Sequence, residues 1–160
     1  MTCGTGDDLS SGPIYIDANP FIYAIEGHDV LARPLALLFQ RLRRQRPSAV
    51  TSELTLAEVL PKASVVQRRL YLDLIVWSGI FDLRAVTREI LIETADFRRA
   101  AGVSGKKAMP ALPDAIHGVT AIRAGCKRML TADSRIRLPR DFEVVEVTEA
   151  AITKLTHEIP

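Results

Sequence analysis

Short apolar segments that alternate with helix-forming ones are the feature that most constrains the fold of this chain. Five segments are rich in β-branched, aromatic or other large apolar side chains and have the length of buried strands: residues 14–16, 49–51, 80–83, 127–131 and 142–147. Helical spacing and end signals predict helices at about 20–27, 29–46, 52–60, 64–78, 87–101, 114–124 and 149–157. This alternation predicts a three-layer α/β/α sandwich with a central, mostly parallel sheet.

Size and composition indicate one domain and exclude several classes of protein. The chain has 160 residues, and we predict a flexible tail over residues 1–12 and a single domain over residues 13–160. No apolar run is long enough to cross a membrane and no secretory signal pattern is present, so we expect a cytoplasmic protein. Cys3 and Cys126 form no metal-binding motif and are expected to be reduced. The net charge of +2 neither requires nor excludes a nucleic-acid partner.

The first predicted strand runs directly into a helix, with a carboxylate between them. Asn19 is a good N-cap and Pro20 suits the first helical position, so we predict that the helix begins there and ends at Gly27. Asp17 follows the strand at its carboxyl end, which is where ligands collect in open α/β sheets. A turn-forming role would also explain a single carboxylate here, so the functional interpretation depends on the other acidic residues.

Three more acidic residues are expected near the same edge. Asp133 follows the fourth predicted strand, and Asp114 opens the helix that leads into that strand. Glu58 is in the middle of a predicted helix, at the border of its apolar face. Taken singly, each of the four is explained as well by a turn, a helix end or a partly buried hydrogen bond. Together with Asp17 they predict a cluster, because parallel strands end at one edge of a sheet.

A cluster of carboxylates is difficult to explain by stability. Like charges at close range repel one another and raise one another's pKa values. A hard divalent cation relieves this repulsion, and Mg²⁺ and Mn²⁺ prefer oxygen ligands of this kind. Such a cation polarises a phosphoryl oxygen and activates water. The residues therefore predict metal-dependent hydrolysis of phosphodiesters.

Four segments resemble, in order, the successive motifs of PIN-domain ribonucleases, and most of all those of VapC-type toxins from toxin–antitoxin pairs. They are Ile14-Tyr15-Ile16-Asp17-Ala18-Asn19, Thr51-Ser52-Glu53-Leu54-Thr55-Leu56-Ala57-Glu58-Val59-Leu60, Pro113-Asp114-Ala115-Ile116-His117 and Leu130-Thr131-Ala132-Asp133. The resemblance spans roughly residues 14–148. It implies a PIN-like sandwich, cleavage of single-stranded RNA with Mg²⁺ or Mn²⁺, a homodimer, and inhibition by a small antitoxin protein.

The resemblance also implies a role for each matching residue. Asp17 and Asp114 are implied as the principal metal ligands, and Asp133 as a third or water-mediated ligand. Glu58 is implied to complete the catalytic cluster by orienting or deprotonating the attacking water. Asn19 and Thr131 are implied to hold neighbouring carboxylates by hydrogen bonds.

Two positions depart from the pattern of the family. Ala18 stands where many members have a hydroxyl, so any contact of that hydroxyl is missing. Ile136 stands where some members have another acid, which leaves the occupancy of a second metal site open.

The remaining candidates are basic or aromatic-ring residues near the predicted edge. For RNA binding we single out Lys106, Lys107, Arg135 and Arg137, although solvated faces explain such residues more simply. His117 offers a general base, but a structural role in a helical turn beside Asp114 is the simpler interpretation.

Two alternatives to a ribonuclease toxin remain at this point. One is a PIN-like fold kept as a non-catalytic binding module, and the other is a housekeeping nuclease that processes RNA or cleaves DNA. If the toxin interpretation holds, we expect an antitoxin tail that brings an Arg or Lys to Asp17, Asp114 or Glu58. The apolar part of that tail would pack around Phe21, Leu35 and Leu38.

Overall fold

The computed structural model describes residues 12–45, 48–103, 109–133, 136 and 138–159, and it contains a five-stranded sheet. The strands are β1 (Ile14–Ile16), β2 (Ala49–Ser52), β3 (Phe81–Arg84), β4 (Arg128–Thr131) and β5 (Glu143–Glu146). Their spatial order is β3-β2-β1-β4-β5, and all four pairings are parallel. The predicted α/β fold with a mostly parallel sheet is confirmed, and β1 lies at its centre.

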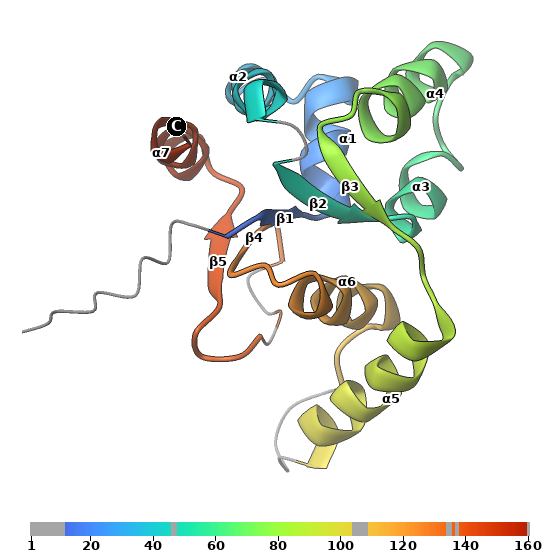
Figure 1. The fold of residues 1–160 in the computed structure, drawn as a ribbon. Coiled ribbons are helices and arrows are strands. Elements are labelled where there is room, and N and C mark those ends of the chain that lie inside the picture. The colour runs from blue at the N-terminus through green and yellow to red at the C-terminus, as the bar shows by residue number, and fades with distance from the viewer. Residues whose placement is uncertain (1–11, 46–47, 104–108, 134–135, 137, 160) are drawn as a thin grey trace, which may run out of the picture.

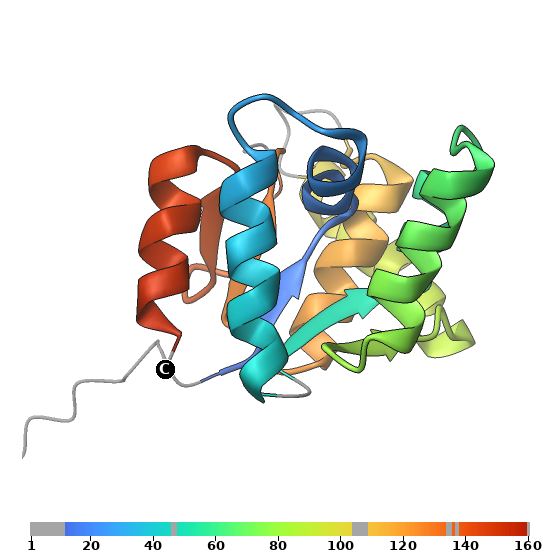
Figure 2. The same cartoon turned by 90° about the horizontal axis from the view of Figure 1, so that it is seen from above.

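Helices cover both faces of this sheet (Figure 1). On one face lie α1 (Ala18–Glu26), α2 (Ala32–Leu42), α4 (Val65–Leu72) and α7 (Glu149–Glu158). On the other face lies α6 (Leu112–Arg123), with α5 (Arg88–Val103) packed against it. The short α3 (Leu54–Val59) follows β2, a 3₁₀ turn at Arg43–Gln45 extends α2, and a π-helix at Asp73–Trp77 extends α4. The view from above shows α7 and α2 side by side across the sheet (Figure 2).

The two faces of β1 show why the sheet must be covered on both sides. Ile14 and Ile16 belong to the main core under α1, α2 and α7, whereas Tyr15 belongs to a second core on the α6 side. Successive side chains of a strand point to opposite faces, so this short strand is buried completely.

Helix packing in the main core corrects one expectation about a partner. Phe21, Leu35 and Leu38 are 0% exposed. Phe21 lies between Phe39 and Phe81, with ring centroids 5.5 and 5.1 Å away. These side chains hold α1 and α2 on the sheet, so an antitoxin tail cannot pack around them.

Several predicted helix ends are wrong by one to three residues. The first helix is capped by Asp17 and not by Asn19, because the Asp17 side chain accepts a hydrogen bond from the Ala18 backbone N–H. α6 begins at Leu112, so Asp114 is in its first turn and does not open it. The expected end of α1 is confirmed: Gly27 has φ of +84°, a left-handed conformation that favours glycine.

The chain after β4 approaches α6 closely at Gly118. A Cβ atom at this position would lie 3.2 Å from Leu138 Cδ2, so a larger residue would require the Leu138 side chain to shift. Gly125 has a different role, since its φ of +72° ends the helix segment. The residue after β4 that replaces an acid in the family pattern, Ile136, packs against the core on this side of the sheet.

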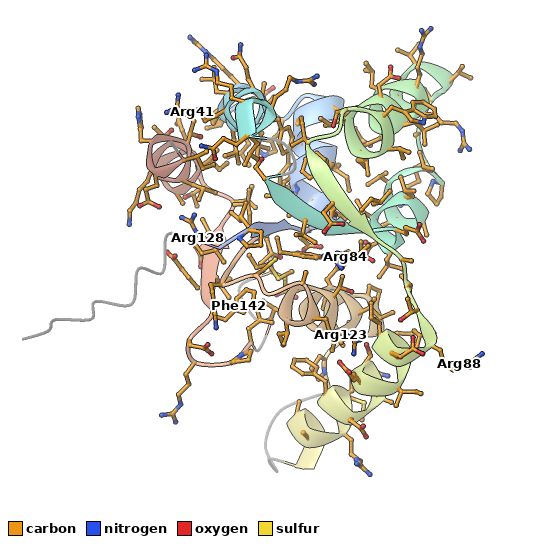
Figure 3. The ribbon with its side chains drawn as sticks, in the orientation of Figure 1. Arg41, Arg84, Arg88, Arg123, Arg128 and Phe142 are labelled. Carbon is orange, nitrogen blue, oxygen red and sulfur yellow. The ribbon has the colours of Figure 1, made fainter. Side chains whose placement is uncertain are left out.

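Arginines labelled in Figure 3 connect the layers at their edges. Arg128 of β4 pairs with Glu158 of α7 at 3.0 Å, and Arg41 of α2 donates to the backbone oxygen of Ile159 at 2.9 Å. Arg123 of α6 pairs with Glu93 of α5. These contacts join α7 to β4 and α2, and α5 to α6. Across the described ranges, no helix combines the length and apolar character that a membrane crossing requires.

Candidate functional site

The candidate site lies where the strand order of the sheet reverses. β1 connects through α1 and α2 to β2 on one side, while its neighbour on the other side is β4. The carboxyl ends of β1 and β4 are joined by a hydrogen bond from the Asp17 N–H to the Leu130 oxygen, at 3.0 Å. In open α/β sheets, the crevice beside such a reversal is the usual place for ligands.

Asp17 is held rigidly at this point. Its Oδ1 accepts from the Ala18 N–H and its Oδ2 accepts from the Thr131 hydroxyl, each at 2.7 Å. The same Thr131 oxygen accepts from the Asp133 N–H at 3.1 Å. Thr131 therefore links the ends of β1 and β4. Asp17 is buried, so its position is fixed by these donors and not by solvent.

Asp114 and Asp133 form a second pair of carboxyl groups beside Asp17. Burial raises the pKa of Asp114, and the negative charges of Asp133 and Asp17 raise it further, together with a hydrogen bond to Asp133. The charge of His117 acts in the opposite direction. The four predicted carboxylates are thus brought to one edge of the sheet. Glu58 comes from α3 and is connected to the others by its contact with His117.

His117, for which the sequence favoured a structural role beside Asp114, contacts two of the carboxylates and Tyr15. Its Nε2 lies 2.7 Å from Glu58 Oε2 and 3.4 Å from Asp17 Oδ1, and its Nδ1 lies 2.7 Å from the Tyr15 hydroxyl. The side chain is 1% exposed. Burial alone would lower its pKa, but the hydrogen bond to Glu58 and the charges of Asp17, Glu58 and Asp114 raise it overall.

A signal for His117 was present in the sequence. It follows Asp114 by three residues, and side chains with that spacing share one face of a helix. Since Asp114 faces the carboxylate edge, His117 had to be close to it. A structural role was the simpler interpretation only as long as the position of Glu58 was unknown.

The donor set fits a divalent cation. Carboxylate oxygens of Asp17 and Glu58 lie within 4.8 Å of each other and of a ring nitrogen of His117, and the surroundings of this nitrogen include the contact with Glu58 described above. Asp114 and Asp133 add further carboxylate oxygens on the same edge. Oxygen-rich sites of this kind suit Mg²⁺ or Mn²⁺, and a cation would remove the repulsion that raises the Asp114 pKa.

Some of the predicted site residues remain predictions. Lys106, Lys107, Arg135 and Arg137 lie outside the described residues, as does most of the predicted tail over residues 1–12. Asn19 is in the first turn of α1 and is partly buried, and its proposed contact with a carboxylate stays a prediction.

Fold and site together define an α/β protein with an acidic cluster at the carboxyl edge of a parallel sheet. The chain belongs to the PIN domain family, whose model matches residues 14–152. Among solved structures it is similar to VapBC2 from Rickettsia felis bound to a DNA fragment from their promoter. That match has a TM-score of 0.59 and 17% identity, and covers 82% of this chain and 96% of that one. No curated protein matches the chain in sequence.

Proposed function

We propose that this chain is a metal-dependent endoribonuclease and the toxin of a toxin–antitoxin pair. The single observation that carries the proposal is the convergence of Asp17, Asp114, Asp133 and Glu58 on one edge, at the reversal of strand order. Membership in the PIN domain family supports nuclease chemistry, because PIN domains are generally nucleases. The likeness to a VapBC2 complex supports a toxin role and an antitoxin partner, and we propose a cytoplasmic location for both.

The roles of the residues follow from their surroundings. Asp17, Asp114 and Asp133 would hold Mg²⁺ or Mn²⁺, which supplies polarisation of the phosphoryl oxygen and activation of water. Asp17 is kept in place for this by Thr131 and by the N-terminus of α1. The Glu58 side chain is 30% exposed and therefore accessible to substrate. We assign Glu58 the role of orienting the attacking water and accepting a proton from that water.

Removal and return of the metal test the proposal. Purified protein should cleave a single-stranded RNA of mixed sequence in the presence of Mg²⁺ or Mn²⁺ and stop when EDTA is added. Excess metal should restore cleavage. A binding module would retain the RNA without cutting it, and a housekeeping nuclease would cut it without arresting growth when the chain is induced in cells.

We predict that the partner of this chain blocks the site with a positively charged side chain. An antitoxin segment that brings an Arg to Asp17, Asp114 or Glu58 can bridge two carboxylates and exclude the metal. Because Phe21, Leu35 and Leu38 are buried, the apolar part of that segment must use side chains that stay accessible, such as Leu37 of α2.

Co-expression with the neighbouring small gene is the measurement. The product should co-purify with this chain and restore growth, and replacing its site-directed Arg by Ala should restore RNA cleavage by the complex. Failure to co-purify and to restore growth would favour the housekeeping nuclease. The proposed homodimer is tested by light scattering against the chain mass of 17.6 kDa.

A further inference from the structure

A line of buried polar side chains leads from the start of α3 to the carboxylate on the same helix. The Leu54 N–H donates to Ser52 Oγ at 3.1 Å, and the Ser52 side chain hydrogen-bonds Tyr15. Tyr15 Oη lies 2.7 Å from His117 Nδ1, and His117 Nε2 lies 2.7 Å from Glu58 Oε2. Four elements, β2, β1, α6 and α3, thus contribute to one connected chain.

The surroundings decide where the imidazole carries its proton. Nε2 faces two carboxylate oxygens, at 2.7 Å and 3.4 Å. The 2.7 Å distance from Nε2 to Glu58 Oε2 is that of a charge-assisted hydrogen bond, so we assign a hydrogen to Nε2 that it donates to Glu58. In the neutral ring Nδ1 is then an acceptor, and the Tyr15 hydroxyl donates to it. Burial raises the pKa of Tyr15 well above its usual value, so this hydroxyl keeps its proton.

We propose that His117 is a positioning residue that holds the Glu58 carboxylate in the site through its Nε2–H, with Tyr15 fixing the ring, and that it is not a metal ligand. The 2.7 Å hydrogen bond to Glu58 engages the ring nitrogen that faces the carboxylates, and the Tyr15 hydroxyl engages the other one. The catalytic consequence rests on the proposed nuclease function, whereas the proton position and the contact with Glu58 do not.

The need for such a residue follows from the position of Glu58. α3 is only six residues long, and the Glu58 side chain is 30% exposed, so the helix by itself does not restrict this flexible side chain. His117 can do so, because it is buried and fixed at both ring nitrogens. Residues that orient the groups around a metal in this way typically affect metal affinity or activity by about 10- to 100-fold.

Nitrogen NMR of the wild-type chain tests the proton position without any assay of activity. At alkaline pH, where the ring is neutral, the His117 spectrum should show a protonated Nε2 and a bare Nδ1, and saturating Mg²⁺ should leave this pattern unchanged. The exposed His28 and His157 provide internal references that should show the ordinary mixture of tautomers. A bare Nε2, or loss of its proton when Mg²⁺ binds, would overturn the proposal.

Paired substitutions test the positioning role. His117→Gln keeps an N–H donor close to the position of Nε2, whereas His117→Leu keeps the volume and removes the donor. His117→Leu should lower kcat for RNA cleavage by about 10- to 100-fold with little change in KM, and His117→Gln should recover most of that loss. Equal activity of the Gln and Leu variants, whether high or low, would mean that the donor is not what matters.

Tyr15→Phe and a control variant distinguish an effect of these hydrogen bonds on activity from a general loss of protein stability. Tyr15→Phe removes the donor to Nδ1 and should return the His117 ring to a mixture of tautomers, with a loss of kcat smaller than that of His117→Leu. Tyr71→Phe removes a comparable buried hydroxyl, which donates to Glu26 at 2.9 Å outside the site, and should leave kcat and the His117 spectrum unchanged. An unchanged His117 spectrum in Tyr15→Phe would contradict the assignment of Tyr15.

The outcome remains decisive if the chain proves not to cleave RNA. In that case the proposed function fails, and Mn²⁺ binding measured by calorimetry replaces the assay. The affinity for Mn²⁺ should then fall in His117→Leu and be largely kept in His117→Gln, together with the same NMR pattern. An equal fall in both variants would indicate a direct ligand and overturn the positioning role.

Discussion

Replacing Asp17 or Asp114 by asparagine is expected to abolish RNA cleavage while the fold stays intact. Each substitution removes a charged ligand from the cation. If about 4 kcal/mol of transition-state stabilisation is lost, the rate falls by about a thousandfold. Cleavage of a single-stranded RNA should be measured with Mg²⁺ and with Mn²⁺ for both variants. Near-normal activity in both would refute the site assignment.

Thermal stability without metal should not fall in these variants. The pKa of Asp114 is raised in the folded chain, which means that its ionised form destabilises the fold at neutral pH. Asparagine removes that charge, so the melting temperature should stay equal or rise slightly. At position 17 asparagine is also a good N-cap and can still accept from the Ala18 N–H.

Asp141→Asn is the matched control for both variants. This carboxylate is exposed, and it pairs with Lys127 at 2.7 Å near the opposite edge of the sheet, where β4 and β5 begin. Its replacement changes the net charge by the same amount as the site variants but leaves the candidate site untouched. Cleavage by this variant should equal that of the wild type, which separates the effect of the site from that of overall charge.

Metal binding should stabilise the wild type far more than Asp17→Asn. A ligand that binds only the folded chain contributes about 2.7 kcal/mol at a hundred times its dissociation constant. For a domain of this size that corresponds to a rise in melting temperature of about 5 to 11 °C. Scanning calorimetry or a dye-based melt with and without Mg²⁺ or Mn²⁺ measures the difference. Equal shifts in the two proteins would mean that the ion binds elsewhere or acts only by screening charge.

The fold was predictable because the sequence signals agree with one another. Each short apolar strand is followed by a segment with helical spacing, and a parallel sheet then directs the residues after β1 and β4 to one edge. This geometric rule is what brought Asp17 and Asp133 together in the prediction, although they are far apart in sequence. No property of either residue alone would have done so.

The cap of the first helix and the partners of His117 were not predictable for physical reasons. Asp17 and Asn19 are equally good caps by residue type, and the choice of Asp17 depends on Thr131, whose hydroxyl reaches it from β4. His117 depends in the same way on Tyr15 and Glu58, which come from other elements. Local preference cannot identify residues whose role is set by contacts distant in sequence.

The central position of β1 also affects the chain while it is being synthesised. β1 leaves the ribosome early, but one of its neighbours is β4, and their pairing joins Ile14 to Arg128. Contacts between residues so far apart form only after the intervening chain is available. Until residues 128–133 have emerged, Asp17 lacks Thr131 and the carboxylate edge is incomplete. The site therefore cannot be assembled on the ribosome before β4 has been made.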